Sequence, residues 1–241
     1  MTSNLLSPAQ PTLDLAFLVH TSPKITDYEY AQIQDFIQLL VRGGNIDSGD
    51  VRVSLSIYRK RGRTHFSLDA YSNMADVIEG ISSYQSTSSN ASLADGLNHV
   101  SKTVFSEMNG ERKFSPNALI VLTDTMSNMG RSKMAAVNRA MRTKDTAVYA
   151  IGVNMVDMSE LESVVSNPRF LYRVNNTDDL MGVRERLVAD IPARKPSMWW
   201  SARSIRWRSS WCPDFVCRQS SRCPGFVFLF SDKQHLPRFC F

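Results

Sequence analysis

The chain has 241 residues, enough for one well-buried domain of ordinary size and an additional segment, and its composition is typical of a soluble globular protein. Its formal net charge of +5 is unevenly distributed. Residues 192–241 contain 9 Lys/Arg and 2 Asp/Glu, whereas residues 1–191 contain 19 Lys/Arg and 21 Asp/Glu. All four Trp and all four Cys also lie in residues 192–241. We therefore expect a domain that is stabilised without disulfides, followed by a basic, poorly ordered tail.

The beginning of the chain carries no targeting signal as written. Residues 1–13 are polar and contain proline, and they lack the cationic and apolar regions of a secretory signal peptide. No apolar run reaches the length of a transmembrane helix. If the domain belongs outside the cell, we expect this chain to be a fragment or an alternative product, and a cytoplasmic form stays open.

The first predicted elements are a buried strand and an amphipathic helix. Residues 13–19 form a nearly continuous apolar run, which is typical of a strand buried on both faces of a parallel sheet. Thr26 and Glu29 have the spacing of a capping box. Apolar residues then recur at helical spacing over residues 33–41, until glycines 43–44 end the pattern. One face of this helix is predicted to be buried.

The rest of the domain alternates between strands and helices. Residues 51–58 and 64–68 predict a hairpin at a sheet edge. Helices are expected at 72–81 and 93–105, capped by Ser72 and Ser92, and at 132–141, 159–165 and 177–191. The last of them has Leu180, Val183, Leu187 and Val188 on one face, and strands are expected at 118–122, 146–151 and 170–174. This order predicts a doubly wound, mostly parallel central sheet flanked by helices, a Rossmann-like α/β fold. The chain then divides into an N-terminal lead (1–12), the domain (13–191) and the tail (192–241).

Loops at the carboxyl ends of the strands converge in such a sheet, and three of them resemble loops of one family. Residues 14–25 (Asp-Leu-Ala-Phe-Leu-Val-His-Thr-Ser-Pro-Lys-Ile) resemble the opening of von Willebrand factor A domains. Residues 92–97 are similar to the helix that follows the metal-binding Thr of that family, and residues 118–124 to its fourth strand and Asp. Residues 149–153 are similar to its fifth strand. The resemblance covers about residues 13–191 and is to the matrix type found in collagen VI and matrilins.

The resemblance implies a metal site in which Mg²⁺ or Mn²⁺ is bound by an Asp-x-Ser-x-Ser motif, a Thr and a further Asp. Ser22 and Asp124 match this pattern. His20 stands at the first Asp position, Lys24 at the second Ser position and Ala91 at the Thr position. One hydroxyl and one carboxylate are a poor ligand set for a hard cation, and a Lys beside them repels it. We therefore expect no stable Mg²⁺ or Mn²⁺ and no other cofactor, and hypothesise that Lys24 contacts Asp124 in place of the cation.

Each of these residues also has an ordinary structural interpretation. With no second His or Cys nearby, we favour His20 as a loop residue hydrogen-bonded to backbone over His20 as a metal ligand. Lys24 is more often solvated than paired at such a position. Ser22 can cap a turn, and Asp124 can accept hydrogen bonds from backbone amides. Both interpretations are compatible with a degenerate site.

Other motifs are weaker. Asn90 and Asn175 begin sequences of the N-glycosylation pattern, which matter only in a secreted chain. Residues 59–63 form a cationic turn, usually a solvated loop, although an acidic partner or sulfated glycan fits it. Residues 203–211 mix Arg with Trp, a composition that can bind nucleic acid or anionic membrane unspecifically, and the tail cysteines lack the spacing of a zinc site.

These observations favour a non-catalytic protein–protein interaction module of the extracellular matrix. The resemblance implies matrix or cell-surface proteins as partners, collagen among them, and gives no reason for a specific nucleic-acid partner. An intracellular scaffold domain is the alternative. A nucleotide-dependent enzyme on the same fold is disfavoured, because the sequence lacks both glycine-rich phosphate-binding motifs and shows no set of catalytic residues.

Overall fold

The computed structural model describes residues 12–20, 22, 25–58, 61–85, 92–125, 131–155 and 158–191, with the backbone alone for residues 131–134. The expected N-terminal lead, except Thr12, and the expected poorly ordered tail lie outside these residues.

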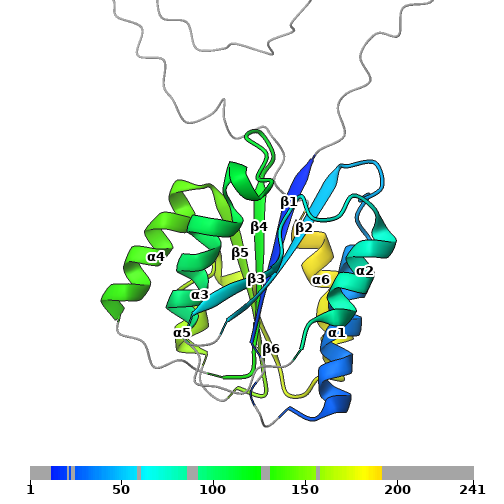
Figure 1. Ribbon diagram of the computed structural model, residues 1–241. Helices are drawn as coiled ribbons and strands as arrows, with labels where there is room; N and C mark the ends of the chain where they lie inside the picture. Colours follow the sequence, from blue (N-terminus) through cyan, green and yellow to red (C-terminus); the bar gives the residue numbers. More distant parts are fainter. Residues whose placement is uncertain are drawn as a thin grey trace, which may run out of the picture. The chain divides into compact units, whose positions relative to one another are not determined.

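A six-stranded sheet forms the centre of the described domain, in the order β3-β2-β1-β4-β5-β6 (Figure 1). The strands are β1 (Leu13–His20), β2 (Val51–Tyr58), β3 (Gly62–Phe66), β4 (Asn117–Thr123), β5 (Thr146–Val153) and β6 (Leu171–Val174). Every neighbouring pair is parallel except β2 and β3, which are antiparallel. The structure therefore confirms the mostly parallel sheet and the hairpin at its edge.

Helices cover both faces of the sheet. They are α1 (Asp27–Val41), α2 (Met74–Ser83), α3 (Leu93–His99), α4 (Arg131–Thr143), α5 (Ser159–Glu162) and α6 (Leu180–Asp190), with the short helical turns η1 (Val100–Val104), η2 (Glu107–Asn109) and η3 (Pro168–Phe170). Figure 1 shows α1, α2 and α6 on one face and α3, α4 and α5 on the other. Within the described residues, no helix is long and apolar enough to span a bilayer.

The sheet separates two hydrophobic cores, and β1 contributes to both. Leu15, Phe17 and Val19 pack in the core beneath α1, α2 and α6. Ala16 and Leu18 point to the opposite face and pack with α3, α4 and α5. This division follows from the strand geometry, in which successive side chains point to opposite faces. It explains why the run reads as continuously apolar.

The α1 prediction is confirmed in detail. The Thr26 hydroxyl accepts a hydrogen bond from the Glu29 amide at 3.3 Å, and the Glu29 carboxylate accepts one from the Thr26 amide at 2.8 Å. The predicted face is buried over Ile33–Val41, at every apolar position of the pattern. Local side-chain chemistry thus sets the start of this helix.

Two other helix starts differ from the sequence pattern. Asn73 caps α2 by accepting a hydrogen bond from the Asp76 amide, whereas Ser72 was the expected cap. α6 begins at Leu180, three residues after Thr177, whose hydroxyl donates to the Gln32 side chain of α1, while the Asn176 side chain accepts a hydrogen bond from the Asp179 amide. Helix propensity alone does not reveal the pairing of Thr177 with a side chain that is distant in sequence.

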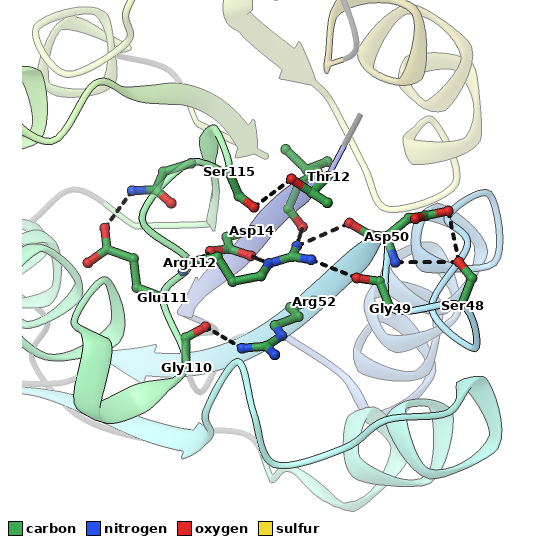
Figure 2. Close-up of polar contacts among 12 residues, drawn as sticks. Thr12, Asp14, Ser48, Gly49, Asp50, Arg52, Gly110, Glu111, Arg112 and Ser115 are labelled. Atoms are coloured by element: carbon green, nitrogen blue, oxygen red, sulfur yellow. Dashed lines mark hydrogen bonds and ion pairs between the residues drawn. The ribbon is translucent and has the colours of Figure 1, made fainter. Parts of the chain in front are cut away.

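The amino ends of β1 and β4 are joined by a buried ion pair (Figure 2). Asp14 is fully buried, and its carboxylate accepts hydrogen bonds from Arg112 Nε and from the Arg112 amide, both at 2.7 Å. The same guanidinium donates to the backbone carbonyls of Leu13, Gly49 and Asp50. A single side chain therefore links the segment before β4 to the starts of β1 and β2.

Candidate functional site

The carboxyl ends of β1 and β4 bring three of the predicted site residues together. β1 and β4 are parallel neighbours, and His20 lies opposite Thr123 in their register. Asp124 is the next residue along the chain from β4, and Ser22 follows two residues after the end of β1. Lys24 and Ala91 lie outside the described residues, so the hypothesis that Lys24 contacts Asp124 stays a prediction.

The Asp124 carboxylate is held by the loop that follows β1. The Ser22 amide donates to both of its oxygens, at 2.9 Å to Oδ1 and 3.0 Å to Oδ2. His20 Nδ1 lies 3.4 Å from Oδ1, and the Thr125 hydroxyl donates to the same oxygen at 3.2 Å. The side chains of His20 and Asp124 are only 1% and 5% exposed. His20 is therefore a buried residue of the strand and not the loop residue that we favoured.

These contacts keep Asp124 ionised. Burial raises the pKa of the Asp124 carboxyl, but the contacts with His20 and Ser22 lower it more, so the pKa lies below its ordinary value. Hydrogen bonds that a carboxylate accepts stabilise its charged form. At neutral pH the site thus contains a nearly buried negative charge.

Tyr58 forms the neighbouring wall of the site, and the sequence analysis missed it. It is the last residue of β2 and fully buried, with its ring centroid 5.1 Å from that of His20. Burial raises the pKa of its hydroxyl above the ordinary value. A Cβ at Gly96 of α3 would lie 2.8 Å from the Tyr58 Cβ, so Gly96 permits this close packing. The position of Tyr58 at the carboxyl end of a strand next to β1 was the available signal.

The start of α3 forms the second loop of the site. Ser92 is its N-cap, accepts a hydrogen bond from the Asp95 amide at 3.2 Å and donates to the Asp95 carboxylate at 2.6 Å. Its predicted capping role is confirmed. The Ser92 hydroxyl thus makes both of these hydrogen bonds within the helix start.

The described residues do not fit the hard cation that this kind of site binds in its intact form. Both oxygens of Asp124 accept hydrogen bonds from an amide, and the neighbouring position carries an imidazole in place of a second carboxylate. Among the described residues, no group of three or more His, Cys, Asp or Glu side chains is arranged to hold a metal ion. Mg²⁺ prefers several oxygen ligands, including carboxylates. The absence of a stable metal remains a prediction for the whole chain.

The structure describes only one of the two asparagines that the glycosylation pattern predicts as acceptors. Asn175 is an exposed residue of the turn between β6 and α6. Asn90 lies outside the described residues.

A doubly wound α/β domain with a polar site where β1 and β4 end belongs to the class of domains that bind ligands at the carboxyl edge of a parallel sheet. The family model of the von Willebrand factor type A domain matches residues 14–186, and the chain belongs to this family. The predicted resemblance is therefore confirmed.

Relatives of the chain include large matrix proteins. It is 24% identical over 178 residues to the collagen alpha-4(VI) chain of Mus musculus, covering 74% of this chain and 8% of the relative. It is 26% identical over 166 residues to matrilin-1 of Gallus gallus, covering 68% of this chain and 33% of the relative. The chain thus spans a small part of these relatives.

The fold is also similar to solved structures of proximal thread matrix protein 1 from the mussel byssus. One has a TM-score of 0.69 and 20% identity, covering 74% of this chain and 47% of that chain. Another, with a TM-score of 0.68 and 23% identity over 74% of this chain and 45% of that chain, has zinc in its metal-ion-dependent adhesion site. At this identity the similarity concerns the fold.

Proposed function

We propose that this domain is a non-catalytic protein–protein interaction module of the extracellular matrix, and that its carboxyl-edge site binds without Mg²⁺ or Mn²⁺. The proposed partners are other matrix or cell-surface proteins, collagen among them. Membership of the von Willebrand factor type A family and the collagen VI and matrilin relatives support the matrix role.

The proposal that the site binds without a metal ion is supported by the contacts around Asp124. In an intact site a divalent cation would balance this carboxylate. In this chain the Ser22 amide contacts both oxygens and the His20 ring lies beside Oδ1. Charge-assisted hydrogen bonds of this kind stabilise a buried carboxylate without a cation. The site is therefore organised before any ligand binds, which lowers the entropic cost of binding.

The test measures binding with and without divalent cations. The full chain is passed over immobilised collagen and other matrix proteins in EDTA and then in Mg²⁺ or Mn²⁺, by surface plasmon resonance. We expect binding of equal affinity in both buffers. Binding that appears only with the cation, or a stoichiometric Mg²⁺ or Mn²⁺ isotherm in calorimetry, would overturn metal independence.

Two variants locate the binding surface. Asp124→Asn keeps the shape of the side chain but removes its charge, and we expect weaker binding to the partner. Glu185→Gln is the matched control, because it neutralises an exposed carboxylate on α6. Equal loss in both variants would contradict a site at Asp124.

A further inference from the structure

The turn between β6 and α6 carries an acceptor sequence for a covalent modification. Asn175, Asn176 and Thr177 follow directly after β6, and the Asn-x-Thr pattern makes Asn175 the acceptor. We infer that Asn175 is the site of N-linked glycosylation of this domain. The inference rests on the proposed extracellular placement, because the modification occurs in the secretory pathway.

The surroundings of Asn175 leave room for a glycan. The residue is exposed, and its carboxamide makes no hydrogen bond to any other residue that the structure describes. The neighbouring Asn176 stabilises the turn, because its side-chain oxygen accepts a hydrogen bond from the Asp179 amide at 3.0 Å. A sugar on Asn175 Nδ2 therefore breaks no side-chain hydrogen bond among the described residues.

Thr177 has two roles that follow one another in time. The transferase requires its hydroxyl, but in the folded domain Thr177 is 4% exposed and its hydroxyl donates to Gln32 of α1. The acceptor is therefore recognised before α1 and α6 pack together. After folding, the hydroxyl is buried while Asn175 and its glycan remain at the surface.

The transfer itself is chemically complete with one co-reactant, a lipid-linked diphosphate oligosaccharide. Asn175 Nδ2 attacks the anomeric carbon of the first sugar, and an N-glycosidic bond forms. The bond between that carbon and the diphosphate oxygen breaks, and the lipid diphosphate leaves with the electron pair. Nδ2 loses one proton to a base of the transferase.

The modified residue lies on the same edge as the candidate site, at some distance from it. β6 is separated from β4 by β5, and strands in a sheet are about 4.8 Å apart, so Asn175 lies about 10 Å along the edge from Asp124. A glycan on Asn175 would therefore lie on the β5 and β6 side of the site, opposite β1 and β2.

In the experiment, the full chain is expressed in mammalian cells behind a leader peptide that directs it into the endoplasmic reticulum. The test then concerns the acceptor sequence alone and not the natural location of the protein. Peptide-N-glycosidase treatment followed by mass spectrometry is expected to report an Asn-to-Asp conversion at residue 175. Translation of the same chain in the presence of microsomes detects glycan transfer even if a variant fails to fold. An unmodified residue 175 in both systems overturns the inference, whatever the function of the domain.

Matched variants separate the modification from folding. Asn175→Gln and Thr177→Ala are expected to abolish the glycan, whereas Thr177→Ser is expected to retain it. Gln32→Ala removes the partner of Thr177 in the folded domain but leaves the acceptor sequence intact, so the glycan should persist. Asn176→Gln should also remain modified. Loss of the glycan in Gln32→Ala with Asn175 intact would contradict recognition before folding.

Discussion

At the amino ends of β1 and β4, the Asp14 carboxylate meets a guanidinium that also binds three backbone carbonyls, whereas at the carboxyl ends Asp124 meets an amide, a hydroxyl and an imidazole. Both carboxylates are nearly or fully buried and join the same two strands. The first arrangement is a fixed structural link (Figure 2). The second leaves a charged group at the edge where ligands of such sheets bind.

The pKa values of the two carboxyls shift in opposite directions. Burial raises the pKa of Asp14, and the contacts with Arg112 offset only part of this effect. At Asp124 the contacts outweigh burial, and the pKa is lowered. Lowering the pH therefore favours the protonated form of Asp14 first. The two ends of the same strand pair should respond differently to acid.

The largest expected effect is the loss of the link at the amino ends. Arg112→Ala leaves the fully buried Asp14 without its cation, and removing one partner of a buried pair costs about 3–5 kcal/mol of the free energy of unfolding. The cost should shrink at low pH, because Asp14 is then protonated. Urea denaturation at two pH values measures both effects.

Arg169→Ala is the control for that prediction. Arg169 pairs with Asp190 at 3.6 Å but its side chain is 59% exposed, and such pairs contribute at most about 1 kcal/mol. If both variants lose the same small amount of stability, the amino-end pair is not the structural link that its geometry indicates.

A smaller effect is expected when the metal ligands of the family pattern are restored at the carboxyl ends of β1 and β4. Replacing His20→Asp, Lys24→Ser and Ala91→Thr together supplies the oxygen ligands that the family pattern contains. We expect this variant to bind Mg²⁺, and at a concentration of 100 times Kd the free energy of unfolding should rise by about 2.7 kcal/mol. Calorimetry and thermal unfolding with Mg²⁺ check this, and the unmodified chain should show no shift.

A second triple variant, with His20→Asn in place of His20→Asp, is the matched control because it lacks the additional carboxylate. Equal Mg²⁺ binding by both triple variants, or by the unmodified chain, would show that the charge at residue 20 does not decide metal binding.

A smaller effect is expected from the acid titration of Asp124. Because its folded-state pKa lies below its unfolded value, ionised Asp124 adds stability above about pH 4, and this stability is lost as the pH falls through the folded-state pKa. Asp124→Asn should cost about 1–2 kcal/mol near neutral pH, with a difference that narrows in acid. Denaturation between neutral and strongly acidic pH measures the difference, and a pH-independent difference would contradict an ionised, stabilising carboxylate.

The sequence predicted the fold better than the contacts of the site. Buried strands such as β1 and the capping box of α1 are encoded locally, in apolar runs and in the Thr26–Glu29 spacing. Thr177, the expected start of α6, instead pairs with Gln32, which is distant in sequence. Val188 was expected on the buried face of α6 but is 39% exposed, whereas Leu187 beside it is buried.

At the site, topology predicted that Ser22 and Asp124 approach each other, and they do. Residue types alone did not reveal that the Ser22 backbone makes the contact, because a backbone amide leaves no mark in the sequence. The burial of His20 against Tyr58 depends on the pairing of β1 with β2 and on the space left by Gly96. Such packing is set by three elements at once.

The smallest effect concerns Tyr58, which tests whether polar groups at the carboxyl ends are as fully satisfied as those around Arg112. The Tyr58 hydroxyl is buried, and its contact with the Thr123 side chain does not have the geometry of a full hydrogen bond. Tyr58→Phe should therefore change the free energy of unfolding by less than about 1 kcal/mol, since a buried hydroxyl with a weak partner contributes little beyond its desolvation cost. Tyr172→Phe is the control, because its hydroxyl donates to the Asp190 carboxylate at 2.8 Å and its loss should destabilise the domain by about 1 kcal/mol. Thermal unfolding of the two variants compares the two changes, and destabilisation by Tyr58→Phe as large as that by Tyr172→Phe would mean that the contact of the Tyr58 hydroxyl with Thr123 is a full hydrogen bond.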